Sequence, residues 1–104
     1  MDKWIRVKPV FDSFTINVGD MLQVFSNDKY KSALHRVLGN TENARYSAPF
    51  FLNPNYSSVV QKLDSTDRPP IYKPFTWGEF RRKRFAGDFA DTGYDDVQIS
   101  QFKI

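Results

Sequence analysis

Short segments in the first half of the chain alternate apolar and polar side chains, and a repeat of two residues is the pattern of an extended strand with one buried face. These segments are rich in β-branched and aromatic residues, which favour strands. The pattern predicts four strands, at residues 4–8, 14–18, 30–38 and 45–52. The last two flank a polar turn at 39–43, so we expect an antiparallel hairpin. Phe50 and Phe51 are expected to pack in the core, one on each face.

Local signals predict helices and turns between and after these strands. Residues 21–25 form a short apolar piece that fits one helical turn, and residues 26–28 give a turn signal. Thr76 and Glu79 have the spacing of a capping box, which predicts the start of a helix of roughly ten residues. Gly87 is the expected end of that helix.

The length of the chain, 104 residues, is enough for one small domain. Within it we expect strands and tight turns at residues 1–53 and a loop, short helix and tail at 54–104. No apolar run is long enough to span a bilayer, so no membrane partner is expected. Cysteine is absent, which excludes disulfides and thiolate metal sites and fits a reducing compartment, so we expect a cytoplasmic location.

Two further motifs have simple explanations. The net charge of +3 owes much to the basic run at residues 81–84, which would lie on the exposed side of the predicted helix. A solvated helix face explains this run better than a phosphate site, so no nucleic-acid partner is expected. Residues 91–93, Asp-Thr-Gly, match the aspartic protease motif, but only eleven residues follow, too few for the long sheet that such an enzyme needs.

Three side chains could together hold a metal and a carboxylate. His35 is the only histidine, and imidazole is a common neutral metal ligand. Arg45 and Ser47 are two residues apart, which places both on one face of a strand. A guanidinium grips a carboxylate with two parallel hydrogen bonds, and a nearby hydroxyl adds a third. Alone, each feature is common; together, on adjacent strands with nine residues between His35 and Arg45, they are a more specific arrangement.

At these residues the chain resembles the iron(II) and 2-oxoglutarate-dependent dioxygenases of the isopenicillin N synthase-like and plant type. The similarity extends over nearly the whole chain and is most specific between residues 17 and 47. The similar segments are Trp4 with Val7 and Pro9, then 14–20, 22–24, 26–27, 30–32, 35–37, 45–47, 50–51 with Pro54, 72–74, 87–88 and 99–100.

The resemblance implies a fold, cofactors and roles for the three residues. The fold would be all-β, the C-terminal half of a double-stranded β-helix (jelly roll), followed by a short C-terminal helix. The cofactors would be iron(II) and the cosubstrate 2-oxoglutarate, with ascorbate as an additional candidate. His35 would be one of three metal ligands, two histidines and one carboxylate. Arg45 and Ser47 would bind the far carboxylate of 2-oxoglutarate. The substrate would be a small organic molecule.

One part of the family pattern is missing. The other two metal ligands form an H-x-D motif, and none of the 34 residues before His35 is a histidine. We therefore expect a C-terminal part of such an enzyme that is inactive alone and assign it no catalytic residue. Unpaired strand edges would let the isolated chain self-associate. Two alternatives stay open: a degenerate jelly roll that binds a carboxylate through Arg45 and Ser47 without redox chemistry, and an interaction module that meets a partner chain.

Overall fold

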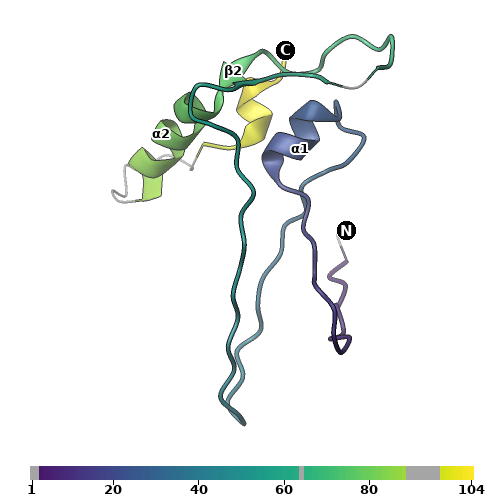
Figure 1. The fold of residues 1–104 in the computed structure, drawn as a ribbon, viewed down its shortest axis with the longest axis vertical. Helices are drawn as coiled ribbons and strands as arrows, with labels where there is room; N and C mark the ends of the chain where they lie inside the picture. Colours follow the sequence, from purple (N-terminus) through teal and green to yellow (C-terminus); the bar gives the residue numbers. More distant parts are fainter. Residues whose placement is uncertain (1–2, 64, 89–96) are drawn as a thin grey trace.

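The computed structural model describes residues 3–63, 65–88 and 97–104. Its helices and strands lie together at one end, and long extended segments hang from them (Figure 1). The elements are α1 (Asp20–Phe25), β1 (Val59–Val60), β2 (Phe75–Thr76), α2 (Trp77–Asp88) and the 3-10 helix η1 (Ile99–Phe102).

The short helix α1 forms where one helical turn was predicted. Asp20 occupies its first turn, where a negative charge is favoured by the helix dipole. Asn27 and Asp28, directly after the helix, have φ angles of 52° and 65°, a left-handed conformation that Asn and Asp adopt more readily than most residues. The predicted turn at 26–28 is thus confirmed. The backbone then leaves the helix as an extended segment.

A small antiparallel sheet leads into the longer helix. β1 pairs with β2 through Val59 with Thr76 and Val60 with Phe75. α2 follows β2 without a break, and the predicted cap is confirmed, because the backbone N–H of Glu79 donates to Oγ1 of Thr76 over 3.1 Å. The helix extends to Asp88, one residue past the end predicted at Gly87.

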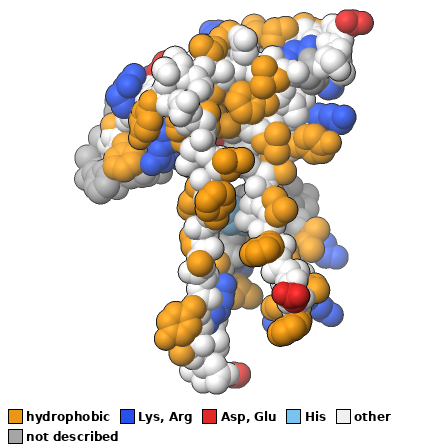
Figure 2. Space-filling view, viewed as in Figure 1, with side chains coloured by type: hydrophobic (Ala, Val, Ile, Leu, Met, Phe, Trp, Pro, Cys, Tyr) orange, Lys and Arg blue, Asp and Glu red, His pale blue; other side chains and the backbone are white. Residues whose placement is uncertain are grey.

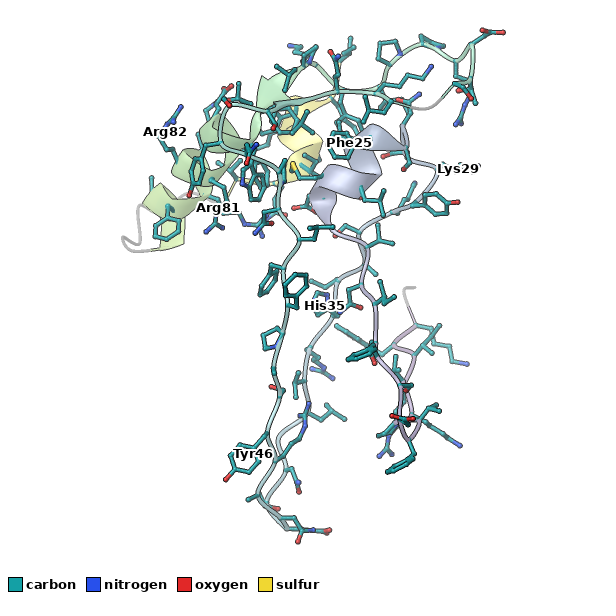
Figure 3. The ribbon with its side chains drawn as sticks, in the orientation of Figure 1. Phe25, Lys29, His35, Tyr46, Arg81 and Arg82 are labelled. Atoms are coloured by element: carbon teal, nitrogen blue, oxygen red, sulfur yellow. The ribbon has the colours of Figure 1, made fainter. Side chains whose placement is uncertain are left out.

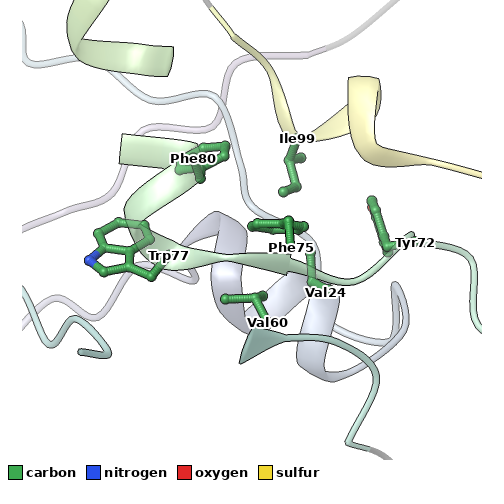
Figure 4. Close-up of a cluster of buried hydrophobic side chains, with 7 residues drawn as sticks. All are labelled: Val24, Val60, Tyr72, Phe75, Trp77, Phe80 and Ile99. Carbon is green, nitrogen blue, oxygen red and sulfur yellow. The ribbon is translucent and has the colours of Figure 1, made fainter. Parts of the chain in front are cut away.

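Among the described residues, seven buried apolar side chains form the core (Figure 4). Aromatic rings dominate it: the centroids of Phe75 and Phe80 are 5.9 Å apart, and the ring of Phe102 lies 4.3 Å from that of Phe75. Val24 of α1 belongs to this core, so the packed region crosses the division expected at residue 53. The core residues are Val24, Val60, Tyr72, Phe75, Trp77, Phe80 and Ile99.

The strands predicted in the first half are not formed. Residues 4–8, 14–18, 30–38 and 45–52 are extended, but over the described part of the chain only β1 and β2 are strands. The hairpin path is present, since two extended segments run down and back beside each other, but no backbone hydrogen bond joins 30–38 to 45–52 in the described structure (Figure 1). A sequence with the right alternation remains unpaired when no neighbouring strand lies within hydrogen-bonding reach.

The extended segments leave many apolar side chains in solvent (Figure 2). Phe50 and Phe51 are exposed, so their predicted place in the core is wrong for this structure. The radius of gyration is 16.5 Å, against roughly 13 Å for a compact domain of this length. The half jelly roll implied by the resemblance is therefore not assembled among the described residues, since its two faces have nothing to pack against. No helix in the described part is long and apolar enough to cross a membrane.

Candidate metal and carboxylate site

His35 lies on the extended segment that descends from α1 (Figure 3). Its side chain is exposed, and its ring nitrogen Nδ1 lies 2.9 Å from the carbonyl oxygen of Ala33. Because a carbonyl oxygen only accepts hydrogen bonds, this contact assigns the proton to Nδ1. In the neutral ring, the lone pair is then on Nε2. Metal-binding histidines commonly use this arrangement, with the second ring nitrogen donating to a carbonyl oxygen.

Arg45 and Ser47 lie together on the returning segment. Both side chains are exposed, and both line one shallow hollow of about 390 Å³ near the hairpin turn. The turn itself is held by Asn40, whose Nδ2 donates to the carbonyl oxygen of Asn43 over 3.0 Å. The predicted polar turn is thus formed. The other residues lining the hollow are Val37, Leu38, Gly39, Asn40, Asn43 and Ala44.

The structure therefore brings two of the three predicted site residues together. Arg45 and Ser47 share the hollow, but His35 does not line it. In Figure 3 His35 lies partway down its segment, whereas Tyr46, between the two clamp residues, lies close to the tip of the hairpin. Among the described residues, the three side chains share no cavity, because no sheet lies behind the hairpin to hold both segments at a fixed separation.

The described residues do not complete an iron site. They contain no group of three His, Cys, Asp or Glu side chains placed to hold a metal ion. His35 provides one neutral ligand, whereas a non-haem iron site of this type needs two histidines and a carboxylate. These residues alone therefore cannot form the iron site that the chemistry needs.

A cation–π contact beside His35 was not predicted from the sequence. The guanidinium carbon of Arg36 lies 4.7 Å from the ring centroid of Trp4. The contact joins the first extended segment to the one that carries His35. An aromatic residue and an arginine 32 positions apart give no local sequence signal, so only the structure reveals this pair.

A polar network at the point where the His35 segment leaves α1 was also not predicted from the sequence. The amide of Gln23 donates to the phenol oxygen of Tyr72 over 2.8 Å and to the carboxylate of Asp28 over 3.0 Å. The Tyr72 hydroxyl in turn donates to Asp28 over 2.5 Å, and the ammonium of Lys103 lies 3.2 Å from the other carboxylate oxygen. These residues give no local sequence signal, because the members of the network lie up to 80 positions apart.

The network shifts the pKa of both acidic groups. Burial would raise the pKa of the Asp28 carboxyl, but hydrogen bonds from Tyr72, Gln23 and Lys103 outweigh it and hold that pKa below its usual value. For Tyr72, burial and the hydrogen bond to Asp28 raise the pKa of the phenol to about 12. Both shifts favour the same state, in which an ionised Asp28 accepts a hydrogen bond from the hydroxyl of a neutral Tyr72.

The basic run on α2 is largely engaged within the chain. Arg84 pairs with Asp20 at 3.1 Å, and Lys83 pairs with Glu79 at 2.8 Å. The guanidinium of Arg81 lies over the rings of Trp77 and Phe85. Figure 3 shows Arg81 and Arg82 on the outer part of this helix. Arg82 and Lys83 are exposed, as predicted for a solvated helix face, whereas Arg81 and Arg84 are half-buried. The Asp-Thr-Gly motif at 91–93 lies outside the described residues.

Comparison with known proteins assigns the family. Residues 1–54 match the 2OG-Fe(II) oxygenase superfamily, and the chain belongs to this family. The match covers the segments that carry His35, Arg45 and Ser47.

Individual relatives are plant oxygenases. The chain is 43% identical over 107 residues to Protein DMR6-LIKE OXYGENASE 2 of Arabidopsis thaliana, an alignment that covers 97% of this chain and 29% of the relative. It is 40% identical over 81 residues to Gibberellin 2-beta-dioxygenase 6 of Oryza sativa subsp. japonica, covering 78% of this chain and 22% of that protein. It is 39% identical over 105 residues to a bi-functional coumaroyl CoA and feruloyl CoA ortho-hydroxylase of Ipomoea batatas, covering 98% and 29%. The chain thus spans less than a third of these relatives. No solved structure matches it.

Proposed function

We propose that this chain supplies one metal ligand and the cosubstrate clamp of an iron(II) and 2-oxoglutarate-dependent oxygenase. His35 would bind the metal through Nε2. The observation that supports this role is the contact between Nδ1 and the Ala33 carbonyl oxygen, 2.9 Å apart, which favours the neutral tautomer with Nε2 available. The remaining ligands would be an H-x-D motif from another part of the same fold. When bound, iron(II) and 2-oxoglutarate would supply the oxidising chemistry.

Arg45 and Ser47 would bind the carboxylate of 2-oxoglutarate that lies away from the metal. Their shared hollow supports the pairing, since one anionic group could contact both side chains there. The guanidinium would contribute two parallel hydrogen bonds and the hydroxyl a third. Exposure to water weakens such contacts, so we expect useful affinity only where a surrounding sheet closes the hollow.

The substrate would be a small organic molecule that is hydroxylated, desaturated or cyclised. The relatives named above act on substrates as different as gibberellins and CoA esters, so their names support the class but no single compound. The domain assignment of residues 1–104, as part of one oxygenase domain, and a cytoplasmic location belong to the same proposal. Imaging of a fluorescently tagged chain would test the location.

The 104-residue chain is proposed to be inactive by itself, because one imidazole in water does not hold iron(II) against exchange. Its unpaired extended segments would also let it self-associate, since the backbone N–H and C=O groups there have no partners in a sheet. Light scattering over a range of concentrations would test this association.

A chimera gives the direct test of function. Residues 1–104 would replace the matching segment of the Arabidopsis relative, to which they are 43% identical, so that the rest of that protein provides the missing parts. We expect the chimera to consume 2-oxoglutarate with iron(II), and the 104-residue chain to show no consumption. A folded chimera without activity would contradict the proposal.

The second candidate function is a carboxylate-binding module without redox chemistry. It is favoured by the separation of His35 from the hollow that holds Arg45 and Ser47. Such a module would bind 2-oxoglutarate equally well with and without iron(II). Measuring 2-oxoglutarate binding to the chimera in both conditions separates the two functions, because a metal-chelated cosubstrate binds only weakly when the metal is removed.

A further inference from the structure

We infer that Gln23 is a positioning residue for His35, and that it transmits the anchoring of the C-terminal residues to the segment that carries the imidazole. The inference rests on the proposed role of His35 as a metal ligand. The amide of Gln23 is buried and forms hydrogen bonds in two directions, toward the core network and toward the segment that carries His35.

The side chain of Gln23 is buried and fully engaged. Its Oε1 accepts the backbone N–H of Ser32 over 2.8 Å. Its Nε2 donates to the Tyr72 hydroxyl and to the Asp28 carboxylate, over 2.8 and 3.0 Å. Buried amides are costly unless their donors and acceptors are paired, and here both sides of the amide have partners. Gln23 therefore holds Ser32 at a fixed position relative to the core.

The core side of this connection is itself anchored to the end of the chain. Tyr72 pairs with Lys103 in an isolated antiparallel bridge, and the Lys103 ammonium contacts Asp28. The backbone N–H of Ile104 also donates to the carbonyl oxygen of Ile71 over 2.9 Å. The last residues of the chain thus hold the two groups that orient the Gln23 amide.

Ser32 is the last anchored amide before His35. The backbone N–H of Tyr30 is held by Oγ of Ser26 over 3.0 Å, and that of Ser32 by Gln23. Within the described structure, no backbone N–H from residue 33 to 38 donates a hydrogen bond. His35 lies three residues beyond Ser32, roughly 10 Å along an extended chain. Ser32 is therefore the nearest held backbone amide before the imidazole, and Gln23 fixes the point from which the segment that carries His35 departs.

The test uses hydrogen exchange measured by NMR on the 104-residue chain. Gln23→Met keeps the size of the side chain and removes its hydrogen bonds. Gln23→Glu keeps an acceptor for Ser32, removes the donors to Tyr72 and Asp28, and sets a second carboxylate beside that of Asp28. Gln101→Met, at an exposed glutamine on η1, is the matched control. Exchange at Ser32 is expressed relative to the amide of Trp77, which donates to Ser58, so that a general loss of stability cancels.

In the wild-type chain we expect the Ser32 amide to exchange on the order of tenfold more slowly than that of Leu34. Gln23→Met should remove this difference and lower the order parameters of residues 33–36. Gln23→Glu should do the same in large part, because it breaks the connection to the core, whereas Gln101→Met should keep both. Equal exchange at Ser32 and Leu34 in the wild-type chain would overturn the inference even if Gln23→Met does not fold. So would a slow Ser32 amide in Gln23→Met.

This experiment is independent of the proposed function. If His35 were not a metal ligand, His35→Ala would leave iron binding by the chimera unchanged, and the exchange pattern at Ser32 would still be as described. If Gln23 did not position the segment, the exchange pattern would fail while the loss of iron in His35→Ala remained. In the chimera, Gln23→Met and Gln23→Glu should both weaken iron binding, whereas Gln101→Met should leave it unchanged.

Discussion

The hydroxyl of Tyr72 donates a hydrogen bond of 2.5 Å to the carboxylate of Asp28, a residue 44 positions earlier in the chain. The bond joins the turn after α1 to the segment before β2. Since Asp28 also accepts from Gln23 and contacts Lys103, one carboxylate joins the N-terminal helix to the end of the chain. The packed part of the molecule depends on its ionised form.

Acid should therefore loosen the packed part. The folded pKa of Asp28 lies below its ordinary value, so its contribution to stability is fully present above the unfolded pKa of about 4 and is lost as pH falls below that value. We expect unfolding monitored by tryptophan fluorescence to show this loss. Asp28→Asn should be less stable near neutral pH and should respond less to acid over the same range. An unchanged acid response in Asp28→Asn would contradict this assignment.

Gly78 should not tolerate a methyl group. A Cβ at this position would lie 2.9 Å from the backbone oxygen of Tyr56, which already accepts the Gly78 N–H. Alanine normally favours a helix by about 1 kcal/mol over glycine, but backbone atoms cannot move aside cheaply. Gly78→Ala should therefore lower the free energy of unfolding in urea. Gly39→Ala, where a Cβ meets nothing within 4 Å, is the control and should be neutral. A more stable Gly78→Ala chain would refute the contact.

The cap of α2 should contribute measurably to stability. Thr76 accepts the backbone N–H of Glu79 through Oγ1. Removing such a cap typically costs about 1 kcal/mol, so Thr76→Ala should shift the urea midpoint downward. Thr76→Ser keeps the hydroxyl and should retain most of the stability. Equal destabilisation by alanine and serine would mean that the methyl group, and not the cap, matters.

Sequence patterns predicted the parts of this fold that depend on neighbours in the chain. The cap of Thr76, the turn at 26–28 and the single turn of α1 were all predicted from local signals, because their hydrogen bonds join residues a few positions apart. The strands at 30–38 and 45–52 were not formed, because alternation describes a face to be buried and does not supply the strand that pairs with it.

In the candidate site, too, local patterns predicted only the contacts between residues that are close in sequence. The spacing of Arg45 and Ser47 was enough to predict that they share one face, and they do line one hollow. Whether His35 joins them depends on the separation between two segments, which a sheet would fix and a local pattern cannot. The contacts of Gln23 with Tyr72 and Ser32 likewise join residues that are distant in sequence, so they give no periodic signal.

The proposed clamp predicts a selective loss of cosubstrate binding. In the chimera described above, Arg45→Ala should weaken 2-oxoglutarate binding by on the order of 30-fold or more, about 2 kcal/mol or above, because a charged bidentate contact is lost. Iron binding should persist, since Arg45 does not contact the metal. Arg82→Ala, at an exposed arginine on α2, is the matched control. Isothermal titration calorimetry measures the change, and an unaltered affinity in Arg45→Ala would exclude the clamp.

The imidazole of His35 is proposed to bind the metal, and the rest of the proposed site depends on it. The most direct measurement is the iron(II) content of the purified chimera and of its His35→Ala variant, with circular dichroism to check that both are folded. We predict about one iron per chain in the chimera, as expected for a site with two histidines and one carboxylate, and a large loss in His35→Ala. A folded His35→Ala chimera that keeps its full iron content would contradict the claim.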